Sequence, residues 1–432
     1  MRILTMTLLV ALSLAGCGGG GGSPQLAPAW QSGVFQPAAN FSDKCAVPRS
    51  GTDPITNTVY PDRAGTLLDE NNWLRSWNND LYLWYSEVVD KNPANYAATL
   101  AYFDVLKTMA VTPSGAPKDK FHFTYDTAAW EALALTGSQA GYGAQWIILS
   151  GTPPRSLVVA YTEPNSPATA PTANLQRGET VINVDGVDLI NASTQADIDV
   201  LNAGLFPTAA GQLHTFMIQA LGGGPTRPIS MTSIDVVTAS VQNTKTITTA
   251  NGKVGYLLFN DHLATAERAL YDAFTTLRAA NVTDLVIDIR YNGGGYLDIA
   301  SEVGYMVAGA TRTNGKTFEL TQFNSKHPTI DPVTNAAITP TPFHNFSLGF
   351  APALPAGQPL PALNLARVFV LTGPDTCSAS EAVINGLKGA GVEVIQIGST
   401  TCGKPYGFYP QDNCGTTYFS IQFRGVNALN FG

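Results

Sequence analysis

A serine and a lysine in two separate segments of the sequence could act together as a nucleophile and a base. Ser378 and Glu381 stand directly before a stretch with helical periodicity, and their spacing is that of a capping box. A capping box alone would explain this serine as the start of a helix. Lys404 follows in the loop after the next predicted strand. Because sequential strands usually lie side by side, we expect Lys404 to return to the edge of the sheet where Ser378 lies.

Ser378 and Lys404 would suit acyl transfer. A lysine that is removed from water loses proton affinity, so it can be neutral near pH 7 and accept the proton of a neighbouring hydroxyl. Ser378 is then the candidate nucleophile and Lys404 the candidate general base. Such a pair needs no histidine.

A glycine-rich segment could supply hydrogen-bond donors to the same reaction. The sequence Asp-Ile-Arg-Tyr-Asn-Gly-Gly-Gly over residues 288–295 lies between a predicted strand and a predicted helix. Glycines there leave backbone N–H groups unobstructed, which suits a site for an oxyanion or a phosphate at a helix N-terminus. Glycine clusters are also common in such turns for steric reasons. The segment therefore indicates a catalytic role only in combination with Ser378 and Lys404.

The elements that position these segments form an alternating pattern. Continuous apolar runs over 254–259, 285–289, 368–371 and 392–397 predict strands that are buried on both faces. Helical stretches near 265–280, 297–307 and 378–388 alternate with them. We therefore predict a largely parallel sheet with crossover helices, in which the serine and glycine segments follow the carboxyl ends of strands.

The chain before this region divides into three parts. Residues 17–62 are predicted to be a tether and an extended leader, and residues 63–136 a helical domain whose aromatic residues form its core. Residues 137–234 carry short β-rich runs with one helix near 195–204. Residues 235–432 hold the alternating region. The chain is thus predicted to be a multidomain α/β protein.

The β-rich part carries a pattern that resembles a PDZ domain of the bacterial protease type. The segment 175–186 has the form L-x-x-G-[DE]-x-[IV]-x-x-[IV]-[ND]-G. A PDZ domain binds an extended peptide as an added strand, and a glycine-rich turn captures the terminal carboxylate. The bland alternative is that the glycines only permit tight turns. The residues predicted to bind the peptide are Gly141, Tyr142, Gly143 and Ala144.

The first residues resemble the export signal of a bacterial lipoprotein. Residues 1–16 have a short positive region, a short apolar region and small residues before Cys17, and a glycine run follows. In such a lipobox the cysteine thiol is acylated, which would attach the protein to a membrane of the bacterial cell envelope. We predict the outer membrane, with the protein facing the periplasm or the exterior. The alternative is an ordinary signal peptide with an incidental cysteine.

Length, composition and charge limit the classes of protein to which the chain can belong. The length of 432 residues predicts two or three domains, and a composition of 44% apolar and 13% charged residues predicts that the chain is mostly folded. The net charge of −8 disfavours nucleic acid as a partner. Cysteine and histidine spacing shows no metal motif, and we expect neither a metal nor a cofactor. Export permits disulfides, and the cysteines that flank a turn-rich stretch, Cys402 and Cys414, are the favoured pair.

Taken in order, these features resemble the carboxy-terminal processing proteases, or tail-specific proteases, of serine peptidase family S41. The resemblance covers residues 65–431. It implies that Ser378 is the nucleophile and Lys404 the general base, and that the N–H groups of Ala379 and of Gly294 or Gly295 form the oxyanion hole. It also implies a core like that of ClpP or crotonase, and substrates that are peptides or proteins with accessible C-termini.

The sequence departs from the family pattern in informative ways. Processing proteases commonly place a glutamine four residues after the lysine, but this chain has Phe408 there, and Gln411 is the nearest substitute for orienting Lys404. The tricorn-like branch has a histidine shortly after a Gly-Tyr pair, where this chain has two leucines, and this favours the lysine. His262 lies in a polar turn and is expected to be a surface or capping residue. The chain stops at Gly432, after a strand-like run over 419–423, where family members continue, which predicts a truncated domain.

The sequence is compatible with three functions. The first is a serine endopeptidase of the cell envelope that cuts exported proteins or peptides, selected by their C-terminal tails, through a Ser-Lys dyad and an acyl-enzyme. The second is a catalytically inactive, PDZ-containing lipoprotein that binds peptides, which the missing glutamine would explain. The third is a crotonase-like acyl-CoA enzyme, although export would separate it from cytoplasmic acyl-CoA. An α/β-hydrolase is disfavoured because G-x-S-x-G is absent.

Overall fold

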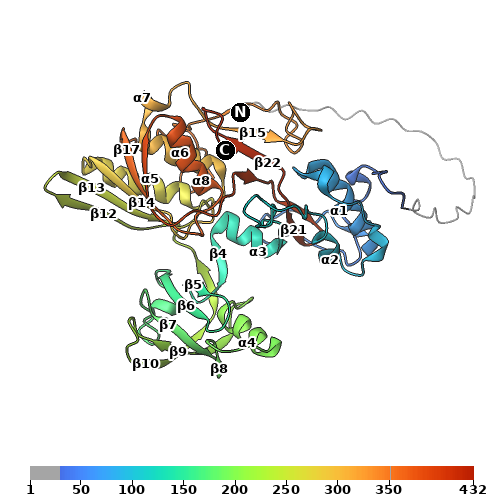
Figure 1. Ribbon diagram of the computed structural model, residues 1–432, viewed down its shortest axis with the longest axis horizontal. Coiled ribbons are helices and arrows are strands. Elements are labelled where there is room, and N and C mark those ends of the chain that lie inside the picture. The colour runs from blue at the N-terminus through green and yellow to red at the C-terminus, as the bar shows by residue number, and fades with distance from the viewer. Residues whose placement is uncertain (1–29, 351) are drawn as a thin grey trace, which may run out of the picture.

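The computed structural model describes residues 30–350 and 352–432 (Figure 1). The predicted signal peptide and the predicted lipidation site, Cys17, lie outside these residues. Within the described ranges, no helix is both long enough and apolar enough to span a membrane.

The C-terminal half is built on a five-stranded sheet with the order β12-β13-β14-β17-β18. Strands β13, β14, β17 and β18 run parallel to one another, and β12 pairs antiparallel with β13. The strands and connecting helices of this half confirm the predicted alternation; their bounds are β12 Val241–Thr249, β13 Gly252–Phe259, α5 Ala266–Ala279, β14 Asp284–Asp288, α6 Leu297–Ala308, α7 Ala310–Thr313, β17 Arg367–Thr372, α8 Ala379–Gly389 and β18 Glu393–Gly398.

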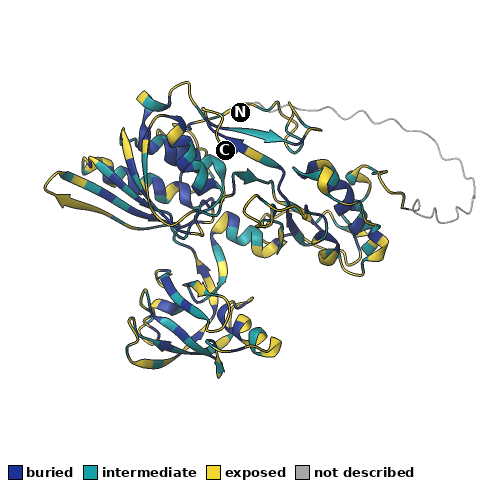
Figure 2. Ribbon diagram, in the orientation of Figure 1, coloured by how far each residue is buried: buried dark blue, intermediate teal, exposed yellow. Residues whose placement is uncertain are grey.

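One hydrophobic core joins this sheet to its helices. Side chains from the sheet strands and from α5, α6 and α8 form a single buried cluster, and Figure 2 shows α6 to be largely dark blue. Helix α6 is buried over most of its length because nine of its twelve residues face other elements. The sheet therefore holds the ends of β14 and β17 rigidly, and these ends carry the glycine and serine segments.

Strands outside the main sheet form two smaller sheets in this part of the chain. The first has the order β16-β15-β22-β19, with β15 Thr317–Phe323, β16 Thr341–Pro342, β19 Tyr406–Gly407 and β22 Phe423–Val426. The second has the order β20-β21-β3, with β3 Phe123–Asp126, β20 Gln411–Asn413 and β21 Thr416–Phe419. The strand-like run over 419–423 is thus not one strand: β21 ends and β22 begins within it, because the two halves pair with different sheets.

The N-terminal part is helical in fewer places than its periodicity predicted. Helix α1, Leu67–Leu81, begins at a capping box between Thr66 and Asp69, and its two tryptophans stack on each other in the core. Within the predicted helical domain, residues 96–109 contain only one short helix, α2, Thr99–Phe103. Tyr418 of β21 completes this core, so part of the core lies more than 300 residues away along the chain. The other short elements are η1 Ala38–Asn40, β1 Lys44–Cys45, β2 Arg63–Ala64, η2 Tyr85–Glu87, η3 Pro93–Asn95, α3 Thr127–Glu131 and η4 Ala132–Thr136.

The β-rich part is joined to the rest by the antiparallel pair β4 Ser138–Gly141 and β11 Ile234–Val237 (Figure 1). Its own sheet has the order β10-β9-β7-β6-β5, with β8 on β7. Strand β5 is therefore an edge strand. The elements are β5 Ala144–Ser150, β6 Ser156–Thr162, η5 Pro167–Thr169, β7 Thr180–Val184, β8 Val187–Asp188, α4 Gln195–Leu205, β9 Leu213–Gln219 and β10 Thr226–Thr232.

The four residues predicted to bind a peptide C-terminus do not share one environment. Gly141 ends β4 and Ala144 begins β5. Tyr142 lies in the core of the β-rich part, where its hydroxyl donates to the carbonyl of Gly204 (3.0 Å). Tyr142 is thus a packing residue, because its ring is enclosed between the strands and α4. Only backbone groups of this segment remain as candidates for binding a peptide.

The cysteines pair differently from the prediction. Cys45 bonds to Cys414, and Cys377 bonds to Cys402. The favoured pair of Cys402 with Cys414 is wrong because these residues belong to different structures: Cys414 lies in the turn between β20 and β21, whereas Cys402 lies in the loop after β18. Proximity in sequence was not a guide to the pairing, because each of these two cysteines bonds to a residue from another segment.

Candidate active site

Ser378 occupies a strained turn between β17 and α8. Its backbone has φ 55° and ψ −120°, in the left-handed region that residues other than glycine rarely adopt. Its N–H donates to Oε2 of Glu381 (3.1 Å), a bond that the predicted capping box requires. Strain of this kind concentrates at functional sites, and a sharp turn from strand to helix exposes a nucleophile. The serine therefore has the backbone geometry of a nucleophile as well as that of a helix start.

Lys404 lies in the same cavity as Ser378. The cavity has a volume of about 780 Å³ and is lined by both residues. The Lys404 side chain is 6% exposed, and its Nζ lies 3.9 Å from the centre of the Phe408 ring and 5.3 Å from that of Phe121. Burial lowers the pKa of Lys404 to about 8, against the opposing effect of the carboxylates of Asp119 and Glu381. The environment thus shifts the amine toward the neutral form that a base requires.

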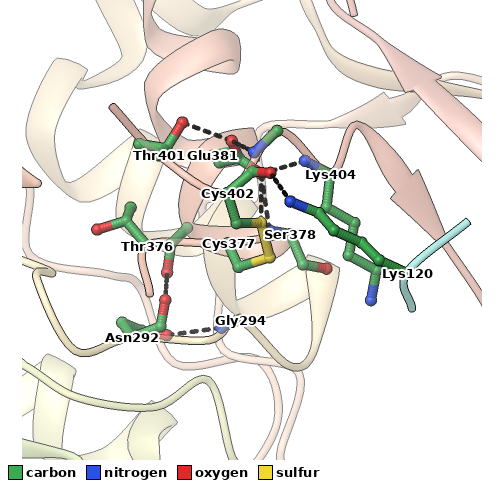
Figure 3. Close-up of a disulfide and its surroundings, with 12 residues drawn as sticks. Lys120, Asn292, Gly294, Thr376, Cys377, Ser378, Glu381, Thr401, Cys402 and Lys404 are labelled. Atoms are coloured by element: carbon green, nitrogen blue, oxygen red, sulfur yellow. Dashed lines mark hydrogen bonds between the residues drawn. A yellow bond between two sulfur atoms is a disulfide. The ribbon is translucent and has the colours of Figure 1, made fainter. Parts of the chain in front are cut away.

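The Ser378 hydroxyl and the Lys404 amine are not yet bonded to each other. Figure 3 shows both side chains on the same side of the disulfide, but no hydrogen bond joins Oγ to Nζ in the part of the chain that the structure describes. Catalytic hydrogen bonds often tighten only when substrate is bound. The fold brings the hydroxyl and the amine to one cavity. We expect the hydrogen bond between them to form when substrate binds.

Glu381 connects the loop that carries Ser378 with the loop that carries Lys404, a role beyond the capping box that its spacing predicted. Its carboxylate accepts from the N–H of Ser378 and also from the N–H groups of Gly403 (2.9 Å) and Lys404 (2.8 Å). The hydroxyl of Thr401 donates to the same carboxylate (2.6 Å; Figure 3). The loop that carries Lys404 is therefore held against the turn that carries Ser378.

The glycine-rich turn packs directly against the serine. Gly294 has φ 102°, and a Cβ atom there would lie 2.8 Å from Cβ of Ser378 and 2.9 Å from the backbone nitrogen of Ala379. Its N–H donates to Oδ1 of Asn292 (2.9 Å), so it is not free to bind an oxyanion. Among the described residues, the N–H groups of Gly295 and Ala379 have no hydrogen-bond partner. These two are the better candidates for the oxyanion hole.

His262 is not a surface residue, so that prediction is wrong. Its side chain is fully buried and lines the cavity that contains Ser378. It packs so closely because Gly295, paired with it in a parallel bridge, has no side chain: a Cβ there would lie 2.5 Å from the His262 carbonyl oxygen. Sequence reasoning missed this contact because only the fold brings the glycine turn to the histidine.

Hydrogen bonding sets the tautomer of His262. Asn292 donates through Nδ2 to the carbonyl of Phe259 (3.1 Å), so its Oδ1 faces the ring and lies 3.0 Å from Nδ1 of His262. An amide oxygen only accepts, so Nδ1 carries the proton and Nε2 carries a lone pair. Burial lowers the pKa of His262 to about 4, and Nε2 has no partner among the described residues. This neutral ring is a second candidate proton acceptor.

Gln411 does not take the place of the missing glutamine. It lies in β20, where it pairs with Tyr418, and it is not among the residues that line the cavity. Phe408, at the family's glutamine position, and Phe121 contact the ammonium group instead. Lys404 is thus oriented by aromatic rings in this structure.

A potential set of metal ligands lies beside the site. The ligand atoms of Cys377, Glu381 and Cys402 lie within 4.8 Å of one another. Both sulfurs belong to one disulfide, so neither is a thiolate that could bind a metal. In the oxidised form this cluster is a cross-link.

Comparison with known proteins bears on this site. Residues 253–408 match the family model described as peptidase family S41. Over this range the chain matches a peptidase S41 family domain. The matched range includes His262, Ser378 and Lys404. No curated protein matched the sequence.

Solved structures give a related result for the fold. A putative S41 protease from Bacteroides fragilis is 24% identical, with a TM-score of 0.59, and the match covers 86% of this chain and 87% of that one. The photosystem II D1 C-terminal processing protease is 18% identical, with 85% and 90% covered and a TM-score of 0.47. The PDZ domain of a carboxy-terminal protease from Vibrio cholerae is 16% identical, with 23% of this chain and 97% of that domain covered and a TM-score of 0.18. The first match shows that the mixed α/β fold is shared with an S41 protease.

Proposed function

We propose that this protein is a serine endopeptidase in which Ser378 is the nucleophile. The observation that carries the proposal is the strained conformation of Ser378, in a cavity that also holds Lys404 and His262. The S41 family match supports a serine peptidase. Ser378 lies at the N-terminus of α8, where the partial positive charge of the helix favours a developing negative charge.

In the proposed mechanism, neutral Lys404 is the general base. It takes the hydroxyl proton as Ser378 Oγ attacks the scissile carbonyl, and the N–H groups of Gly295 and Ala379 stabilise the oxyanion. Collapse of the tetrahedral intermediate breaks the C–N bond, and the amine leaves with the proton from the lysine. Water then attacks the acyl-enzyme with Lys404 again acting as base, which releases the second product and restores the serine.

His262 is the competing proton acceptor. Its Nε2 has no hydrogen-bond partner among the described residues, and the amide of Asn292 holds the ring in the required tautomer. A pKa of about 4 keeps the ring neutral at physiological pH, but it also makes His262 a weaker base than Lys404. We assign the base to Lys404 because burial brings its pKa near to working pH.

We further propose that substrates are exported proteins or peptides selected by their C-terminal tails. The unpaired edge of β5 could accept an extended tail as an added strand. Acylation of Cys17 would hold the enzyme at the cell envelope. These proposals are independent of the chemistry at Ser378.

A peptide-binding protein without peptidase activity is the second candidate. It is favoured by the aromatic contacts of Lys404 and by its lack of a hydrogen bond to Ser378 in the described chain. The test is to incubate purified wild type and Ser378→Ala with unstructured peptides and to analyse the products by mass spectrometry. The proposed function expects cleavage by the wild type alone. Binding without cleavage by both proteins would favour the second candidate.

A further inference from the structure

We propose that the Cys377–Cys402 disulfide positions Ser378 and Lys404 for catalysis, and that its reduction lowers peptidase activity. The inference rests on the proposed function. The proposed function names the reacting groups, whereas the disulfide concerns how the loops that carry these groups are held together. It makes activity dependent on the thiol-disulfide state.

The disulfide joins the two loops at their catalytic ends. Cys377 directly precedes Ser378, and Cys402 stands two residues before Lys404. The strands that lead into these loops, β17 and β18, are parallel neighbours, so both loops emerge at the same edge of the sheet. Figure 3 shows the disulfide between the nucleophile turn and the lysine loop. No other covalent link joins these loops in the described chain.

The nucleophile side of the disulfide is rigid. The N–H of Cys377 donates to the carbonyl of Asn292 (3.1 Å), and the buried hydroxyl of Ser380 donates to the same oxygen (3.1 Å). Helix α8 then continues into the main core. The nucleophile turn therefore has support that does not depend on the cross-link.

The lysine side depends more on the cross-link. Residues 399–405 lie between β18 and β19 and form neither helix nor strand. This loop is tied to the nucleophile turn by the disulfide, by the Glu381 carboxylate, and by the N–H of Cys402, which donates to the carbonyl of Thr376 (3.0 Å). Without the covalent bond, the link between this loop and the nucleophile turn consists of hydrogen bonds. Because small displacements of catalytic groups cost large factors in rate, Lys404 is the residue that loosening would affect.

The N-terminal part covers the lysine loop from the other side. The ammonium group of Lys120 donates to the carbonyl of Cys402 (3.0 Å), and the ring of Phe121 faces Lys404 Nζ. The carboxylates that face Lys404 are Asp119, from the same covering segment, and Glu381, from α8. Burial between these elements outweighs both carboxylates and lowers the pKa of Lys404 to about 8. A loosened loop would expose Lys404 to water, and its pKa would rise toward the ordinary value.

A small dithiol can reduce the Cys377–Cys402 disulfide by thiol-disulfide exchange. The dithiol loses two electrons and its two protons and becomes a cyclic disulfide, while the Cys377–Cys402 bond breaks and each sulfur becomes a thiol. Cys377 and Cys402 are both half-buried, whereas in the other disulfide Cys414 is half-buried and Cys45 is fully buried. Both cysteines of the active-site disulfide are thus partly exposed, but only one cysteine of the other disulfide is.

The test compares the oxidised wild type, the wild type treated with dithiothreitol, and two double variants. Cys377→Ala with Cys402→Ala removes the active-site disulfide, and Cys45→Ala with Cys414→Ala is the matched control. Each protein is assayed for kcat/KM against one peptide from pH 6 to pH 10. A chelator is present throughout, so that no metal can bind the thiols together with Glu381. Alkylation and mass spectrometry establish which disulfide was reduced, and circular dichroism establishes that the fold persists.

We expect reduction of Cys377–Cys402 to lower kcat/KM at pH 8 by about tenfold or more and to move the midpoint of the pH profile upward. The Cys377/Cys402 variant should resemble the reduced wild type and be insensitive to dithiothreitol, while the Cys45/Cys414 variant should keep both the activity and the response. Equal activity of oxidised and reduced wild type, or lost activity with an unchanged midpoint, would overturn the inference. A wild type that is inactive in both states would overturn the proposed function, and the inference with it.

Discussion

The backbone of Gly294 lies so close to Ser378 that a Cβ atom on the glycine would be 2.8 Å from Cβ of the serine. Real Cβ atoms essentially never approach so closely. The positive φ of Gly294, 102°, adds a second reason for glycine at this position. The glycine turn and the nucleophile turn therefore form one packed unit, although 83 residues separate them in the sequence.

This contact predicts that Gly294→Ala lowers kcat/KM by about 100-fold or more, because the new methyl group displaces Ser378 or the adjacent N–H groups. Gly293→Ala is the matched control: a Cβ at Gly293 meets nothing within 4 Å, and its backbone is not in the left-handed region. Peptide cleavage by both variants, with their thermal melts, is the measurement. Equal losses in the two variants would contradict the proposed packing role.

The conformation of Ser378 predicts that removal of its side chain abolishes activity without lowering stability. Ser378→Gly should abolish cleavage and, by relieving a backbone strain of order 1 kcal/mol or more, raise the free energy of unfolding or leave it unchanged. Chemical denaturation and peptide cleavage provide the two readouts. Marked destabilisation by glycine would indicate that the Ser378 side chain serves mainly to begin α8.

Lys404 predicts a dependence of activity on pH. The neutral amine is the active form, so activity should be low at pH 6 and should rise through a midpoint near the lowered pKa of about 8. If His262 were the base instead, its pKa of about 4 would leave activity nearly constant from pH 6 to pH 8. A kcat/KM profile of the wild type separates the two candidates, and Lys404→Ala and His262→Ala identify the residue responsible.

Selection by C-terminal tails predicts an effect of the terminal carboxylate. Amidation of a substrate C-terminus should weaken binding, because it removes the negative charge that backbone N–H groups near β5 would capture. Deleting residues 137–234 should impair cleavage of tailed proteins more than cleavage of short peptides, provided that the rest stays folded. Identical KM values for amidated and free-acid peptides would exclude capture of the carboxylate, whatever the chemistry at Ser378.

The main sheet and its helices could be predicted from the sequence because each element has a local pattern of apolar residues. Buried parallel strands appear as continuous apolar runs, and the spacing of Ser378 and Glu381 before a helical stretch predicts the start of α8. The predictions that failed concern pairings between distant segments. Strand β21 pairs with β3 across almost 300 residues, and no local pattern indicates such a partner.

In the candidate site too, local sequence signals could be interpreted, whereas contacts between distant segments could not. Ser378 and Lys404 could be placed together because adjacent parallel strands deliver their loops to one edge. His262 could not, since its burial depends on the bare backbone of Gly295. Asn292 stands in the glycine-rich segment, but its amide has meaning only once it faces the imidazole. The disulfides were mispaired for the same reason, because their geometry is set by tertiary structure.

The central claim is that Ser378 is an activated nucleophile, and its most direct test is covalent labelling. A fluorophosphonate reacts with an activated serine by forming a bond from Oγ to phosphorus and releasing fluoride. We predict that mass spectrometry will find the adduct on Ser378 of the folded wild type, that Lys404→Ala will slow labelling strongly, and that labelling will abolish peptide cleavage. Full cleavage by folded Ser378→Ala, or labelling confined to other serines, would contradict the claim.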